Sequence, residues 1–162
     1  MKRLLERLEI EVRLLEALRS TTEEERLALG AGDFQRIQAC TERKEKILEA
    51  YRSLGISRDH LIERLPGGPA VLAGEMSLQA LIRSIGGDFV EPLLEAIGTI
   101  QSHGRKLKRT NSVNSVLLQR TCDLMLRARS VLAGGASSEP VYTRRGHFRT
   151  ASMDATVVRE QA

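Results

Sequence analysis

The stretch that decides the fold of this chain is LLEAIGTIQSHGRKLKRTNSVNSVLLQRTCDLMLRARSVL, residues 93–132. Alternating steps of four and three residues lead through it without a slip, along a seam formed by Leu93, Ile97, Ile100, Gly104, Leu107, Asn111, Asn114, Leu118, Thr121, Met125, Ala128 and Leu132. This repeat is typical of a helix that packs lengthwise on other helices. Pro92 suits a first turn and Gly134 ends the run, so we expect one helix over residues 88–133, about 65–70 Å long.

Two shorter helices precede this long one. Residues 2–29 have an apolar face at helical spacing, which Glu11, Thr22 and Glu25 interrupt. The Gly30–Asp33 turn can end this helix and cap a second one over residues 33–54, which Gly55 closes. The pattern therefore predicts a helical hairpin.

The middle of the chain is broken into shorter pieces. Ser57 can cap a short helix that extends to Leu65, and the Pro66–Pro69 segment interrupts the chain. Apolar residues at helical spacing then predict one more short helix over residues 78–85.

The predicted helices differ in length, at about 40, 33 and 65–70 Å. Part of the long helix must therefore face the middle segment, the tail, a second copy or another protein. Either the middle segment covers the whole seam, or an apolar ledge remains exposed as an association surface. Asn111, Asn114 and Thr121 dilute the apolar seam, which favours a reversible partner over a permanent one.

Composition agrees with a small all-α protein. The chain has 162 residues, only 3% of them aromatic, which disfavours a β-sandwich or barrel. It lacks a run of about 20 apolar residues that could span a membrane, and its charged N-terminus does not resemble a signal peptide. We expect a cytoplasmic protein with a helical domain over residues 1–133, a hairpin plus a very long helix, and a flexible tail over 134–162.

No pattern in the sequence indicates an enzyme, a cofactor site or a metal site. Cys40 and Cys122 lie far apart, without the spacing of metal ligands, and the three histidines are scattered. No catalytic triad motif, phosphate-binding loop or dinucleotide fingerprint is present.

The net charge of +4 comes mainly from one segment. Residues 104–129 contain seven Lys and Arg residues and one acid, Asp123. The segment has no aromatic residues on which bases could stack, so a solvated face is a better interpretation than a nucleic-acid site.

Three short motifs resemble one known family. They are LALGAGDFQRI at residues 27–37 with Lys44 and Lys46 beyond it, the Asn111–Asn114 pair followed by Val116–Leu118, and Tyr142 to Gly146 in the tail. Their order and spacing are similar to those of the FlgN-type flagellar export chaperones. The resemblance covers residues 1–148.

The resemblance implies a cytoplasmic, all-helical chaperone of the flagellar type III secretion system. Its clients would be the hook-filament junction proteins FlgK and FlgL, held near their C-terminal helical ends before export. The client helix would contact the exposed part of the long helix through Asn111, Val113, Asn114, Leu117, Leu118, Thr121, Leu124, Met125, Ala128 and Leu132. Tyr142 and Gly146 would belong to a tail element that docks on the client or on the export machinery.

Two other functions stay open at this point. The seam from Leu93 to Leu132 can pair with a second copy of itself, which would make the protein a self-associating coiled-coil adaptor. Less favoured is nucleic-acid binding through Arg105, Lys106, Lys108 and Arg109.

Overall fold

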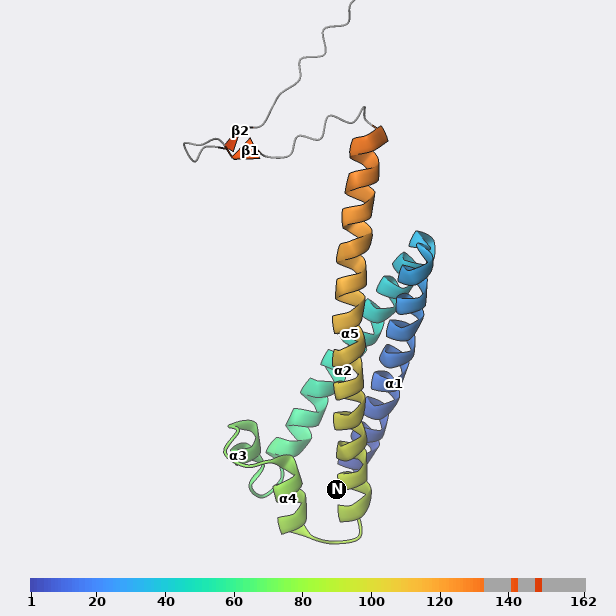
Figure 1. The fold of residues 1–162 in the computed structure, drawn as a ribbon. Coiled ribbons are helices and arrows are strands. Elements are labelled where there is room, and N and C mark those ends of the chain that lie inside the picture. Colours follow the sequence, from blue (N-terminus) through green and yellow to red (C-terminus); the bar gives the residue numbers. More distant parts are fainter. Residues whose placement is uncertain (133–140, 143–147, 150–162) are drawn as a thin grey trace, which may run out of the picture. The chain divides into compact units, whose positions relative to one another are not determined.

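A computed structural model describes residues 1–132, 141–142 and 148–149 (Figure 1). Its helices are α1 (Lys2–Ala31), α2 (Phe34–Glu63), α3 (Gly68–Leu72), α4 (Leu78–Ile85) and α5 (Val90–Leu132). Two-residue strands, β1 (Val141–Tyr142) and β2 (Phe148–Arg149), pair antiparallel. The all-α prediction is confirmed, although the sequence did not predict this short β pair.

The chain divides into two compact units, Met1–Thr121 and Cys122–Ala162. The first unit contains α1 to α4 and most of α5. The predicted flexible tail, residues 134–162, lies outside the described residues except for β1 and β2. The predicted domain boundary at residue 133 stays a prediction.

The hairpin of α1 and α2 forms at the turn that the sequence predicts (Figure 1). Gly32 adopts a left-handed conformation with φ 67°, which glycine allows without a steric penalty. The Asp33 side chain then accepts a hydrogen bond from the Arg36 amide at 3.0 Å and so caps α2.

Helix α2 differs from the prediction, because it continues through Gly55 to Glu63. No separate helix begins at Ser57. Leu54 and Ile62 are both buried two turns apart on one side of α2, and this burial outweighs the cost of about 1 kcal/mol for a glycine inside a helix. Helices α1 and α2 are therefore equal at 30 residues each, against 43 residues for α5.

The short helix predicted over residues 78–85 is confirmed as α4. The Ser77 hydroxyl accepts a hydrogen bond from the Ala80 amide at 3.1 Å and caps it. Before it, α3 begins where the chain passes the end of α2 so closely that a Cβ at Gly68 would lie 1.8 Å from the Ile62 carbonyl oxygen.

Buried side chains from four helices meet in one core cluster. Its members come from α1, α2, α4 and the start of α5: Leu4, Leu8, Ile62, Ile82, Leu93, Ala96 and Ile97. The middle segment thus covers the beginning of the predicted seam through Ile82, and not its whole length.

The polar residues that interrupt the apolar face of α1 have partners across the bundle. Glu11 accepts from Arg58 of α2 at 2.7 Å, and Glu25 pairs with Lys44 of α2 at 2.6 Å. The Thr22 hydroxyl donates to the Leu18 carbonyl within α1 at 2.7 Å. These pairs fix how α2 lies along α1, because a shift of one turn would separate both ion pairs.

Candidate protein-binding faces of the long helix

The part of α5 in the first unit contacts the bundle along one side. Leu93, Ala96 and Ile97 are buried there, and further along only Asn114 is buried. Leu107 and Thr121, seven residues on either side of Asn114, are half-buried. This side of α5, from Leu93 to Thr121, is called the bundle side below.

The seam is displaced from the predicted one at alternate positions. Of the predicted seam residues in the first unit, Gly104, Asn111 and Leu118 are exposed. Nothing lies within 4 Å of a Cβ built at Gly104. Beyond Ile100, steps of four and three residues instead connect the half-buried or buried residues His103, Leu107, Thr110, Asn114, Leu117 and Thr121, so the heptad repeat holds but includes the residue before each exposed one.

Asn114 is a predicted site residue that its own chain already engages. Its side chain is 5% exposed, and its Nδ2 donates to the Thr22 carbonyl oxygen at 2.9 Å and to Glu25 Oε2 at 2.8 Å. Both partners are acceptors, so the orientation of the amide is fixed by the network. Asn114 thereby holds α5 against α1 next to the Glu25–Lys44 ion pair.

A cleft of about 250 Å³ opens beside Asn114, where α1, α2 and α5 meet. Leu29 and Ile37 form part of its apolar wall with Leu118, and Asn111 and Asn114 line it from α5. We call this the distal cleft. It brings three of the predicted site residues together, and it also includes Lys44, which the sequence did not single out as a site residue.

The other predicted residues in the first unit have different surroundings. Val113 is exposed, whereas Leu117 and Thr121 are half-buried. The Thr121 hydroxyl donates to the Leu117 carbonyl at 2.9 Å, a bond within α5 that leaves the hydroxyl oxygen free to accept another.

The last turns of α5, residues 122–132, belong to the second unit and are exposed throughout. Among the predicted site residues, Leu124 is 68% and Leu132 87% exposed, and Met125 and Ala128 are exposed as well. Leu126 and Val131 add to this apolar surface. The sequence-based site did not include these two residues, which lie outside the seam positions.

The predicted tail residues are only partly described. Tyr142 lies in β1 opposite Phe148 of β2, and Gly146 lies outside the described residues. Their docking role stays a prediction.

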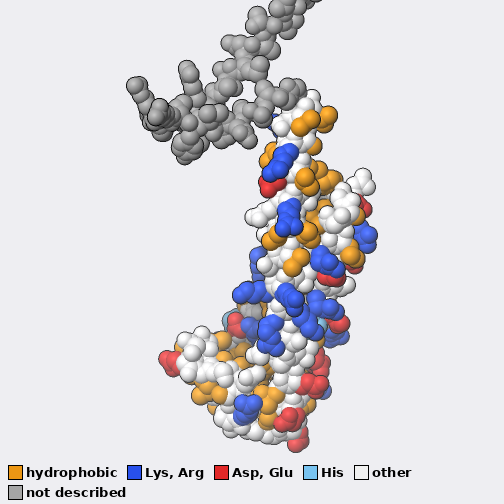
Figure 2. Space-filling model, viewed as in Figure 1, with side chains coloured by type: hydrophobic (Ala, Val, Ile, Leu, Met, Phe, Trp, Pro, Cys, Tyr) orange, Lys and Arg blue, Asp and Glu red, His pale blue; other side chains and the backbone are white. Residues whose placement is uncertain are grey.

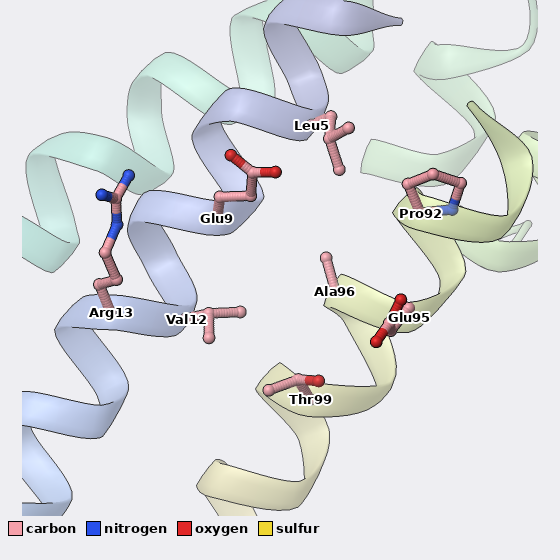
Figure 3. Close-up of a pocket in the computed structure, with 8 residues that line it drawn as sticks. All are labelled: Leu5, Glu9, Val12, Arg13, Pro92, Glu95, Ala96 and Thr99. Atoms are coloured by element: carbon pink, nitrogen blue, oxygen red, sulfur yellow. The ribbon is translucent and has the colours of Figure 1, made fainter. Parts of the chain in front are cut away.

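A second cleft, of about 420 Å³, lies between the first turns of α1 and α5. Figure 3 shows Leu5 and Val12 of α1 on one side of it, and Pro92 and Ala96 of α5 on the other. Glu9, Arg13, Glu95 and Thr99 complete the lining. The one signal for this cleft in the sequence is that Leu5 and Val12 broaden the apolar stripe of the first helix.

The described part of the chain contains no group of three or more His, Cys, Asp or Glu residues that could hold a metal ion. Cys40 is buried and Cys122 is exposed, and both are free thiols. No helix among the described residues is long and apolar enough to cross a membrane.

These features define a class, a small all-helical protein whose longest helix presents apolar side chains to solvent. The family model described as FlgN protein matches residues 1–150, and the chain therefore belongs to the FlgN family. This family consists of flagellar export chaperones, which bind flagellar proteins and are not known as enzymes. No curated protein and no solved structure matches the chain.

Proposed function

We propose that this protein is a cytoplasmic chaperone for the hook-filament junction proteins FlgK and FlgL, and that it holds a C-terminal helical segment of the client before export. Family membership supports a flagellar export chaperone. The observation that supports the binding mode is the exposed apolar surface of α5 over residues 122–132.

An amphipathic client helix suits this surface. A helix presents apolar anchors three and four residues apart, and Met125, Ala128 and Leu132 recur at the same spacing on α5, with Leu124 beside Met125. Met125 has a flexible thioether side chain that adapts to differently shaped partners. Burial of these side chains would also keep the apolar face of the client away from water and from premature assembly.

In the first unit, the distal cleft offers a second place for an apolar client side chain. Leu118, Leu29 and Ile37 supply the apolar wall, and Asn111 supplies an exposed amide at the rim. Asn114 would act indirectly in this scheme, by positioning α5 through its bonds to α1.

The test is co-purification of the protein with FlgK or FlgL. We expect Met125→Asp and Leu132→Asp to weaken binding by about tenfold or more, because each places a charge where the client buries apolar surface. Ser130→Asp is the matched control, since Ser130 is an exposed polar residue on the same turns and should tolerate the same charge. Full binding by both apolar variants, with unchanged helical circular dichroism, would refute this mode of capture.

Sedimentation velocity over a range of protein concentrations tests the alternative of a self-associating adaptor. We expect a monomer or a weak oligomer that opens when client is added. A tight dimer that no client opens would favour the adaptor over the chaperone.

A further inference from the structure

A second set of exposed residues runs along α5 in the first unit, away from the bundle side. We call Lys106, Arg109, Val113, Val116 and Arg120 the outer stripe. They follow one another at steps of three and four residues, so at 100° per residue they share one face of α5. All five are exposed, and their face is turned about a third of a turn from that of Asn114.

The cations of the outer stripe lack acidic partners in the described structure. From Ala96 to Cys122, α5 contains no Asp or Glu, whereas Arg105 and Lys108 flank the stripe with further positive charge. No ion pair forms to any of the five Lys and Arg residues in this stretch within the described part of the chain. Figure 2 shows Lys and Arg side chains gathered over the middle of α5.

The two valines are not explained by the stability of the protein. Val113 and Val116 are 45% and 46% exposed, so they contribute little to the core. A β-branched side chain also lowers the stability of a helix relative to alanine or leucine. Apolar residues between cations at heptad spacing instead match the surface that a helix uses to contact another helix.

We propose that the outer stripe binds an acidic amphipathic helix of a partner protein. Apolar residues of that helix would cover Val113 and Val116, while its flanking Glu or Asp residues would pair with Lys106, Arg109 and Arg120. A second copy of α5 does not fit, because the same cations would face one another. A nucleic acid fits less well, since α5 contains no Phe, Tyr or Trp on which bases could stack.

The outer stripe is separate from the proposed client surface. The stripe lies within the first unit, over residues 106–120, whereas the proposed client surface of α5 consists of residues 122–132 in the second unit. Val113, which the sequence predicted as a client contact, is assigned here to the outer stripe instead. The inference therefore does not rest on the proposed function, and a variant can disable one surface without the other.

The probe is a synthetic helical peptide of about three heptads, with Leu at the a and d positions and Glu at e and g. Fluorescence anisotropy of the labelled peptide measures its binding to the full chain. We expect binding that weakens as salt rises to about 0.15 M and above. The same peptide with Lys in place of Glu should not bind.

Two double variants divide the contributions. Arg109→Glu combined with Arg120→Glu should weaken binding of the Glu peptide by about tenfold or more, because two attractive charge pairs become repulsive. Val113→Ser with Val116→Ser should also weaken it, which a purely electrostatic contact would not show. Ser130→Asp, the control at an exposed polar residue outside the stripe, should leave peptide binding unchanged.

Three results would overturn the inference. One is equal binding of the Lys peptide, and another is unchanged binding of the Glu peptide to the charge-reversed variant. The third is a protein that does not bind the Glu peptide but does bind single-stranded RNA or phosphatidylserine vesicles, with the same affinity after the two Val→Ser changes. This result would show that the cations bind phosphate groups.

Discussion

Replacement of Arg58 by methionine should destabilise the protein strongly, because it leaves a buried carboxylate without its partner. Glu11 is 1% exposed, and its Oε1 accepts from Arg58 Nη1 at 2.7 Å. Glu11 Oε2 has no hydrogen-bond partner in the described structure. After Arg58→Met, the Glu11 charge would stay in the interface between α1 and α2 without the cation that now pairs with it.

The magnitude follows from this burial. Removal of one partner of a buried ion pair costs about 3–5 kcal/mol, and Arg58 is itself 27% exposed, so we expect the lower end, about 3 kcal/mol. The double variant Glu11→Leu with Arg58→Met removes both charges and should lie within about 1 kcal/mol of the original protein, or above it. A large non-additive term between the two positions is therefore expected.

Urea unfolding at neutral pH, followed by circular dichroism at the helix band, measures the effect. A loss of 3 kcal/mol lowers the urea midpoint by about 1 M or more for a typical m value. Arg52→Met is the matched control. Arg52 lies on the same helix and pairs with Glu49 at 3.6 Å, but both side chains of this pair are more than two-thirds exposed, so its loss leaves no buried charge. It should change stability by no more than about 0.5 kcal/mol. A midpoint of Arg58→Met equal to that of Arg52→Met would show that the Glu11–Arg58 pair does not hold α1 to α2.

The remaining predictions concern three other parts of the first unit. Gly104→Ala should raise the free energy of unfolding by about 0.5–1 kcal/mol, because the added Cβ meets open space. Gly68→Ala should lower it by more than about 2 kcal/mol, because the added Cβ would overlap the Ile62 carbonyl. Urea midpoints that move in the same direction in both variants would contradict this geometry. Burial and the neighbouring Glu11 raise the pKa of Tyr51 to about 12. The stabilisation from its neutral phenol should therefore be complete below pH 10 and lost as the pH rises towards 12. Tyrosinate absorbance measures the ionisation, and the urea midpoint of the original protein should fall over this pH range more than that of Tyr51→Phe. Asn114→Ala should cost about 2 kcal/mol by thermal or urea unfolding, since it removes one hydrogen bond to a carboxylate and one to a backbone oxygen; a neutral result would mean that α5 does not depend on this contact.

The sequence predicted the parts of the fold that local chemistry decides. The left-handed Gly32 and the Asp33 cap are requirements of one turn, and they identify the hairpin without any knowledge of the rest of the chain. Apolar spacing predicted α4 but not its cap at Ser77, and the cap predicted at Ser57 begins no helix. Periodicity over many turns was sufficient to predict α5, because each turn repeats the same evidence.

The sequence could not predict features that depend on distant partners. Gly55 alone predicts a helix end, but Leu54 and Ile62 are buried. Ile62 belongs to the core cluster formed with α1, α4 and α5, and this burial stabilises α2 beyond Gly55. The exposure of Gly104, Asn111 and Leu118 likewise depends on how α5 is rotated about its own axis against the hairpin, because the residues before them are half-buried, and no spacing within α5 reveals this rotation. The predicted site residues over 122–132 follow from spacing along one helix, whereas the surroundings of Asn114 and Leu118 depend on contacts with α1 and α2 that this spacing does not contain. The client-binding role of all these residues stays a prediction.

Polar contacts explain why α5 exposes one set of side chains and not another. Apolar burial is non-directional, so the bundle side of α5 could slide by a turn along α1 at little cost in buried area. Glu25 prevents this, because its two oxygens bind Lys44 of α2 and Asn114 of α5 at the same time. A slip of α5 by one turn would leave the Asn114 amide and a Glu25 oxygen buried without partners, a cost of at least about 1–3 kcal/mol. Glu25 on α1 therefore fixes the register of α5, and together with the Glu11–Arg58 pair it fixes that of α2. This register determines the exposure of Leu118 at the distal cleft and of Val113 on the outer stripe.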